Sequence, residues 1–169
     1  MSTDGWTKGN QYDLNTYSYG VGYDSKGELF YFSKEDYELI KQYTWNVNTC
    51  TGYVLNGKTG IRMHRLIMNA TPNIEIDHIN LNKADNRREN LRFATHQENN
   101  FNKRCYENNK NQIKGVYWHK ERHKWYAKIY VNYKSIHLGL YDDINDAIEA
   151  RKRAEIQYQG TFRYNENKN

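Results

Sequence analysis

Hydrophobic and polar positions alternate along this chain in patterns that predict short strands and short helices. An apolar, aromatic run over 29–32 is typical of a strand. Ser33 and Asp36 follow it with the spacing of a helix-capping pair, which predicts a short helix over 34–43. Apolar residues return on both sides of Thr51-Gly52 and predict a hairpin there.

Two further strands are predicted on either side of a long polar loop. Residues 74–77 alternate between apolar and acidic, and residues 91–93 alternate between apolar and basic. Residues 80–90 between them are almost entirely polar. Thr95 and Glu98 then form a capping box, which starts a helix at Thr95. The local order is therefore strand, long loop, strand, helix.

The last third of the chain predicts a separate small unit. Three strand candidates cover 115–118, 125–131 and 136–141, and Asp142-Asp143 caps a helix that ends at Gly160. Small alanines allow this helix to lie close to a three-stranded sheet. One helix face is marked by Ile144, Ala147, Ile148, Ala154 and Tyr158. The fold class expected for the whole chain is α+β.

The composition favours small cores and a polyanionic partner. Only 37% of the 169 residues are hydrophobic and the mean hydropathy is -1.10, which argues against one large core. The 16 tyrosines and 4 tryptophans suit small sheets and stacking against bases. A net charge of +5 and a pI near 9.0 favour nucleic acid, although many soluble proteins are mildly basic.

The two cysteines and the apolar runs bear on the expected compartment. Cys50 and Cys105 lie far apart and outside any CxxC pair, so reduced thiols are expected rather than a zinc knuckle or disulfides. No apolar run is long enough to span a membrane, and the N-terminus lacks the apolar segment of a signal peptide. We therefore expect a cytoplasmic (intracellular) protein with no membrane partner.

The residue types needed for metal-assisted cleavage of a phosphodiester are concentrated in residues 77–99. His78 suits the role of general base near neutral pH. Asp77 and Asn99 offer oxygen ligands for Mg²⁺ or Mn²⁺, and Asn90 can tie the loop near His78 to backbone groups. Each residue alone is more often structural, so the combination carries the hypothesis. Adjacent strand residues point to opposite faces, so Asp77 and His78 converge only where the strand ends or bulges.

These motifs resemble two known families. His64-Arg65-Leu66-Ile67, Asp77-His78-Ile79-Asn80, the run from Asp85 to Arg92, and Thr95 to Asn100 resemble HNH endonucleases, more narrowly the HNN-type homing endonucleases of phages and introns. Lys114 to Trp118, Trp125 to Ile129, Leu138 to Tyr141 and the helix after them resemble an AP2 DNA-binding domain. The sequence departs from plant AP2 proteins, because it lacks several of their arginines on the DNA-binding strands.

The resemblance implies a ββα-metal nuclease core with one Mg²⁺ (or Mn²⁺) per active site. His78 would be the general base, Asn90 the central brace, and Asp77 and Asn99 the metal ligands. Asn99 stands where many relatives carry histidine, which favours a hard alkaline-earth ion over zinc. His64 is expected to be a packed or hydrogen-bonded residue.

The resemblance also divides the chain. Residues 1–20 would be an N-terminal arm or an irregular edge, 21–101 an HNH nuclease domain, 102–112 a polar linker, 113–163 an AP2-like DNA-binding domain with a three-stranded antiparallel sheet and one helix, and 164–169 a tail.

The expected partner is double-stranded DNA. Along the middle strand of the second unit, Lys124, Tyr126, Lys128 and Tyr130 would share one face, with Trp125, Ala127, Ile129 and Val131 packed inward. The residues expected to contact DNA are Arg65, Arg87, Arg92, Lys103, Arg104, Tyr117, His119, Lys124, Lys128, Tyr130, Lys134 and His137. The mixture of Tyr, Lys and His favours backbone contacts over base reading.

The leading hypothesis is a site-specific DNA endonuclease of the homing type, a phage-encoded enzyme that acts in a bacterial host. A single HNH site cuts one strand, so a nicking monomer is expected rather than a dimer. Two alternatives stay open: a DNA-binding protein whose nuclease half is silent, and a dimeric HNH restriction enzyme that makes double-strand breaks.

Overall fold

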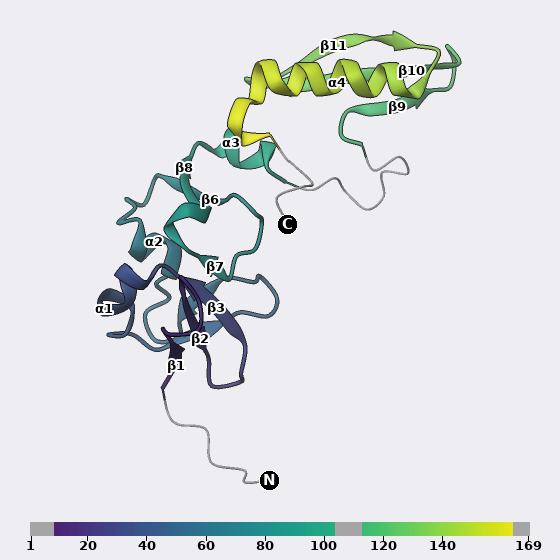
Figure 1. The fold of residues 1–169 in the computed structure, drawn as a ribbon. Coiled ribbons are helices and arrows are strands. Elements are labelled where there is room, and N and C mark those ends of the chain that lie inside the picture. Colours follow the sequence, from purple (N-terminus) through teal and green to yellow (C-terminus); the bar gives the residue numbers. More distant parts are fainter. Residues whose placement is uncertain (1–8, 104–112, 164–169) are drawn as a thin grey trace, which may run out of the picture. The chain divides into compact units, whose positions relative to one another are not determined.

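The computed structural model describes residues 9–103 and 113–163, which form two compact units that divide between Ala94 and Thr95 (Figure 1). Both are mixed α/β structures, and each is described separately below. Within the described part of the chain, no helix is long and apolar enough to cross a membrane.

A four-stranded sheet organises the first unit. Strands β1 (Gln11–Asp13), β2 (Gly20–Tyr23), β3 (Leu29–Phe32) and β7 (Asp85–Asn86) lie in the order β1-β2-β3-β7. The first three pair antiparallel, whereas β7 pairs parallel with β3. Part of the segment expected to be an arm or irregular edge is therefore the edge strand β1, and residues 1–8 lie outside the described range. Strand β7 lies within the loop predicted over 80–90.

Short helices and a hairpin complete the first unit. A 3₁₀ turn η1 (Lys34–Asp36) leads into α1 (Tyr37–Ile40), and α2 covers Met63–Ile67. The predicted hairpin is confirmed, with β4 (Trp45–Val47) paired antiparallel to β5 (Val54–Asn56).

The predicted capping pair at Ser33 and Asp36 is wrong. Ser33 precedes the 3₁₀ turn but makes no side-chain capping bond. Its hydroxyl accepts a hydrogen bond from the backbone N–H of Arg88 at 2.9 Å. The buried carboxylate of Asp36 instead accepts two hydrogen bonds from Arg88 Nε and one from its terminal nitrogen. A distant arginine has replaced the local backbone partner, because a buried carboxylate is stabilised far more by a cation than by one N–H.

The core of the first unit is aromatic and aliphatic. Its centre is Trp45, which is fully buried and donates its indole N–H to the Ile40 carbonyl at 2.8 Å. The rings of Phe30 and Phe32 lie where side chains at Gly22 and Gly20 would be, which explains two glycines in one strand. The other members of the buried cluster are Val54, Met63, Ile67, Ile76 and Leu91.

The strands predicted at 74–77 and 91–93 are β6 (Glu75–His78) and β8 (Leu91–Ala94), which pair antiparallel. A 3₁₀ turn η2 (Arg88–Asn90) leads into β8. The predicted apolar face is only half confirmed: Ile76 and Leu91 are buried, whereas Phe93 is 51% exposed. Asp77 and His78 are buried as well, so this hairpin buries polar groups that require partners.

The second unit has the predicted secondary structure. Helix α3 (His96–Phe101) begins at Thr95, and the capping box is confirmed because Thr95 and Glu98 exchange side-chain to backbone hydrogen bonds. Strands β9 (Val116–His119), β10 (Lys124–Val131) and β11 (Lys134–Tyr141) form an antiparallel sheet in the order β11-β10-β9. Helix α4 (Ile144–Gln159) follows, capped by Asp143, and the short turn η3 (Gly160–Phe162) ends the described chain.

Alanines and one arginine form the buried side of α4. Ala147, Ala150 and Ala154 are buried, which confirms the expectation that small residues allow close packing on the sheet. Tyr158, predicted on the same face, is 39% exposed, so that prediction is wrong. Arg151 is buried instead, because its long side chain lies next to Gly115, where no side chain intervenes.

Candidate active site and DNA-binding face

His78 lies at the end of a strand and inside the protein. It is the last residue of β6 and is 5% exposed. Its Nε2 lies 3.5 Å from the side-chain oxygen of Asn86 on β7. The amide nitrogen of Asn86 donates to the Ala84 carbonyl at 3.1 Å, which orients the amide oxygen toward the imidazole. Burial lowers the pKa of His78, while Asn86 and the charge of Asp77 act in the opposite direction.

A second histidine and a tyrosine pack against His78. The ring centroids of His64 and His78 are 5.0 Å apart and nearly perpendicular. Tyr53 lies 5.1 Å from His64 and 6.0 Å from His78. His64 is therefore a packed residue, as one of the two sequence-based expectations had it. Burial, with a further contribution from the charges of His78 and Arg62, lowers the pKa of His64 to about 3.

Asp77 faces a different group from His78. Its carboxylate, 3% exposed, accepts hydrogen bonds at Oδ2 from Nε and a terminal nitrogen of Arg92, at 2.8 and 2.6 Å. The two residues are directly opposite each other in the β6–β8 register. Asp77 thus points toward β8, while His78 contacts Asn86 on β7. This agrees with the expectation that adjacent residues of a strand point to opposite faces.

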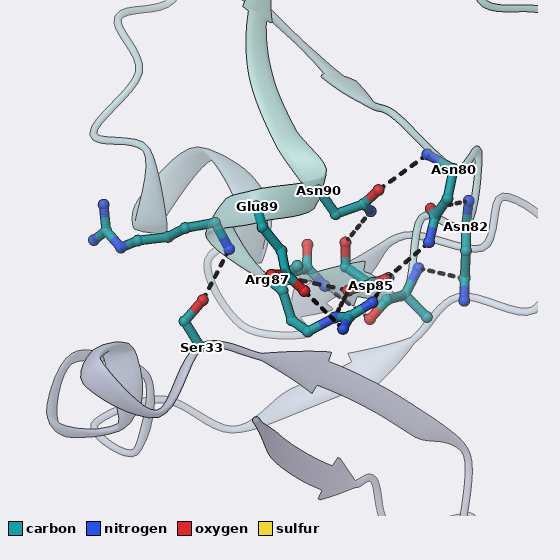
Figure 2. Close-up of polar contacts among 10 residues, drawn as sticks. Ser33, Asn80, Asn82, Asp85, Arg87, Glu89 and Asn90 are labelled. Atoms are coloured by element: carbon teal, nitrogen blue, oxygen red, sulfur yellow. Dashed lines mark hydrogen bonds and ion pairs between the residues drawn. The ribbon is translucent and has the colours of Figure 1, made fainter. Parts of the chain in front are cut away.

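Asn90 holds the loop that follows His78 (Figure 2). Its side-chain oxygen accepts from the N–H of Asn80 at 2.9 Å, and its amide nitrogen donates to the Asp85 carbonyl at 2.8 Å. Its own carbonyl accepts from the N–H of Ile79 at 2.9 Å. The predicted tie between Asn90 and loop backbone is confirmed, whereas a part in catalysis stays a prediction.

Asp85 is the second buried centre of this loop. Its carboxylate accepts from the amide of Asn80 at 2.8 Å and from two guanidinium nitrogens of Arg87 at 2.8 and 2.7 Å (Figure 2). Arg87 also pairs with Glu89 at 2.8 Å. Asn82 extends the network by accepting from the N–H of Ala84 at 3.1 Å. A loop this polar keeps a fixed shape because most of these contacts lie within it.

The oxygen donors predicted to hold a metal fit a hard divalent cation by their chemistry. Asp77 provides a carboxylate and Asn99 an amide, and Mg²⁺ commonly takes one or two protein ligands and completes its shell with water and phosphate. Asn99 lies on α3, with its backbone N–H bonded to the Thr95 carbonyl. Across 9–103 and 113–163, no three His, Cys, Asp or Glu side chains form a metal-binding group. Metal binding by Asp77 and Asn99 stays a prediction.

Comparison with known proteins agrees with this geometry. Residues 63–101, which include β6, the Asn90 loop, β8 and α3, match the HNH endonuclease family. This segment is similar to an HNH endonuclease domain. A relative from Acanthamoeba polyphaga mimivirus, named as an uncharacterized HNH endonuclease, is 33% identical over 92 residues, which is 50% of this chain. The match covers 49% of the relative, so the chain spans about half the length of the curated relative that it matches. No solved structure matches the chain.

Most arginines of the matched segment that were predicted to contact DNA are bound within the protein. Arg65 donates to the carbonyls of Ile74, Ala70 and Thr71 and so holds the turn after α2. Arg87 and Arg92 bond to buried aspartates, as described above. Contact of these three with DNA stays a prediction. Lys103 donates to the Asn100 side chain at 2.5 Å, and Arg104 lies outside the described residues.

The outer face of the second unit brings most of its predicted DNA-binding residues together. In the strand register, Tyr126 lies opposite Tyr117, and Lys128 lies opposite His137. Ala127 and Ile129 are buried between them, which confirms the predicted alternation. The residues that share this face, called here the outer face, are Tyr117, His119, Lys124, Tyr126, Lys128, Tyr130, Ser135 and His137.

Aromatic stacking organises the outer face. The Tyr126 ring stacks on His137 with centroids 4.6 Å apart and lies 4.8 Å from Tyr117. The ammonium of Lys128 lies 5.3 Å from the Tyr117 ring centroid, and Lys124 pairs with the exposed Asp142. Lys134 lies opposite Val131 and therefore on the other side of the sheet, which its place in the sequence did not indicate.

Sequence reasoning missed Asn86 and Tyr53 as neighbours of His78. Asn86 was within a recognised motif, but nothing local marks it as the residue that meets the imidazole. Tyr53 is 25 residues before His78 in a different hairpin, and one tyrosine among 16 gives no sequence signal.

Proposed function

We propose that this protein is a site-specific DNA endonuclease of the homing type, which hydrolyses one phosphodiester with one divalent cation. The observation that carries the proposal is the buried His78, which lies at a strand end inside the matched segment and next to a loop held by Asn90. A buried imidazole with an oriented amide beside it is the arrangement that a general base requires.

His78 is proposed to take the proton from the attacking water. Because the amide oxygen of Asn86 can only accept, it places the imidazole proton on Nε2. Nδ1 is then the nitrogen that receives the proton. A lowered pKa keeps the ring neutral and therefore basic at physiological pH.

Asp77 and Asn99 are proposed to hold the cation, Mg²⁺ or Mn²⁺. When bound, such an ion stabilises negative charge that develops on phosphate oxygens. Two hydrogen bonds from the guanidinium of Arg92 fix the direction of the Asp77 carboxylate. Asn90 keeps the loop in place and so acts as a positioning residue.

The second unit is proposed to bind double-stranded DNA in the manner of an AP2-like domain. The support is the outer face, where lysine, histidine and tyrosine side chains gather on a small sheet. A sheet of this size fits the major groove, and Tyr, Lys and His suit phosphate contacts. We further propose a monomer that nicks one strand inside a host cell.

The direct test is conversion of a supercoiled plasmid pool carrying random genomic inserts into open circles. The full chain is incubated with Mg²⁺, Mn²⁺ or EDTA, alongside His78→Ala. We expect open circles that require both the cation and His78. His123→Asn is the matched control, because it removes an exposed histidine from the β9–β10 turn and should leave nicking unchanged.

The other outcomes separate the alternatives. Linear product from single-site plasmids would indicate a dimeric enzyme that cuts both strands. If DNA is bound in a gel shift but no condition gives cleavage, the protein is a binding module with a silent nuclease half. Cleavage that persists in His78→Ala would refute His78 as the base.

A further inference from the structure

Two positive charges converge on one tyrosine ring beside His78. The guanidinium carbon of Arg62 lies 4.9 Å from the Tyr53 ring centroid, and the ammonium of Lys83 lies 4.6 Å from it. The same ring contacts His64 and His78. Arg62, Tyr53 and Lys83 come from three separate segments and are together called here the Tyr53 cluster.

Arg62 differs from every other arginine in residues 9–94. Arg65 bonds to backbone carbonyls, and Arg87, Arg88 and Arg92 bond to buried aspartates. Within the described residues, the guanidinium of Arg62 has neither a carboxylate nor a carbonyl partner. It is exposed and held only by the aromatic ring, so its N–H donors remain available.

Lys83 is oriented but not neutralised. Its ammonium donates to the Thr51 carbonyl at 2.9 Å, and no acidic side chain of the described chain pairs with it. This hydrogen bond and the Tyr53 ring fix the direction of a long flexible side chain, yet an ammonium carries three donors.

Arg62 and Lys83 are both held on the Tyr53 ring without an acidic partner among the described residues, so an added anion would be attracted to this cluster. The buried aspartates nearest to His78 cannot serve, because Asp77 and Asp85 are engaged by Arg92 and Arg87. An anion that binds this cluster would therefore come from outside the protein. Next to a general base for phosphodiester hydrolysis, the chemistry that fits is a phosphate of the DNA backbone.

We propose that the Tyr53 cluster is a phosphate-binding subsite in which Arg62 and Lys83 hold the backbone at or next to the scissile bond. Tyr53 is the positioning residue, because its ring orients both cations and packs against the histidines. The subsite rests on the proposed nuclease function for its role in cleavage, whereas its affinity for phosphate does not.

The test measures DNA binding and cleavage separately in the full-length protein. Binding of a fluorescent 30-base-pair duplex is followed by anisotropy at several salt concentrations for Arg62→Gln, Lys83→Gln and the double variant. Each lost phosphate contact should reduce the slope of log affinity against log salt by about 1. Lys26→Gln removes an exposed charge at the β2–β3 turn and is the matched control.

Nicking of supercoiled plasmid gives the second readout. We expect kcat/KM to fall by about 10²-fold in the double variant, as for other donors that hold a reacting phosphate or oxyanion. Arg62→Lys and Lys83→Arg keep the charges and should retain the salt slope and most of the activity. These two charge-conserving variants also test the subsite if a glutamine variant folds poorly.

The outcomes distinguish this inference from the proposed function. If the wild type never cleaves but the glutamine variants lower the salt slope, the nuclease proposal fails and the phosphate subsite stands. If the wild type cleaves and the double variant matches Lys26→Gln in both slope and rate, the subsite is refuted and the nuclease proposal stands.

Discussion

The two units of this protein use their basic residues in opposite ways. In the first unit, Arg88 and Arg92 bond to aspartates that are about 3% exposed. On the outer face of the second unit, Lys128 is exposed and Lys124 pairs only with an exposed aspartate. A buried carboxylate needs hydrogen-bond partners that replace water, and a guanidinium is the strongest of them, whereas an exposed lysine needs no partner. Positive charge is therefore architecture at these buried aspartates and a candidate DNA contact on the outer face.

Removal of an architectural arginine should have the largest effect on folding. In Arg88→Ala, the buried Asp36 loses its guanidinium hydrogen bonds, and we expect the free energy of unfolding to fall by about 2–3 kcal/mol. The half-exposed position of Arg88 places this at the lower end for a broken buried pair. Urea denaturation of the full chain measures it. Lys128→Ala is the control and should change stability by less than about 0.5 kcal/mol; equal losses would remove the contrast between the units.

Acid should destabilise the first unit through His64. Its pKa is about 3 in the folded protein and near 6.5 when unfolded, so the unfolded chain binds the proton more tightly. The stabilising contribution is complete above pH 6.5 and decreases as the pH falls toward 3, by about 1.4 kcal/mol per pH unit. In His64→Asn this slope should become shallower. His137→Gln, at an exposed site in the second unit, should keep the wild-type slope; a slope that His64→Asn leaves unchanged would contradict the assignment.

DNA binding should show the reverse order of sensitivity. Lys128→Ala is expected to lower the salt dependence of duplex binding by about one unit of slope, because the exposed ammonium can release a counterion from a phosphate. Arg88→Ala should leave the slope unchanged under conditions where it is folded, since its guanidinium stays on Asp36. Anisotropy titrations at several salt concentrations decide this. A drop for Arg88→Ala would show that internal pairing does not prevent DNA contact.

The smallest expected effect belongs to the surface pair of the second unit. Lys124 and Asp142 lie 3.0 Å apart with both side chains well exposed. A double-mutant cycle with Lys124→Ala and Asp142→Ala should give a coupling energy of about 0–0.5 kcal/mol. A coupling above about 1 kcal/mol would mean that surface charges in this unit also have an architectural role.

Local signals predicted much of the fold. The capping box at Thr95, the hairpin near Thr51 and the alternation along β10 are confirmed, because each depends on residues within a few positions of one another. The binding face on β10 followed from the period of two that any strand imposes on its side chains. The order of strand, loop, strand and helix over residues 75–101 was likewise evident in the sequence and coincides with the matched HNH segment.

Failures occurred where a local signal met a distant partner. Ser33 and Asp36 have the side chains of capping residues, but both bond to Arg88, which is 52 residues after Asp36. The Arg88 backbone N–H donates to Ser33, and its guanidinium donates to Asp36. The pattern of the 80–90 loop contained no sign that Asp85–Asn86 would pair parallel with β3. Burial explains the first failure, because a carboxylate that is removed from water pairs with the strongest hydrogen-bond donor within reach.

The sequence by itself determined most of the elements, which face of the second sheet is polar, and which residue types could perform phosphodiester hydrolysis. The tertiary structure alone decided which charges are available. It engaged Arg65, Arg87 and Arg92 with groups of the protein. It left Arg62 and Lys83 on the Tyr53 ring without acidic partners among the described residues. The physical reason is that periodicity depends on neighbours along the chain, whereas desolvation and ion pairing depend on neighbours in space.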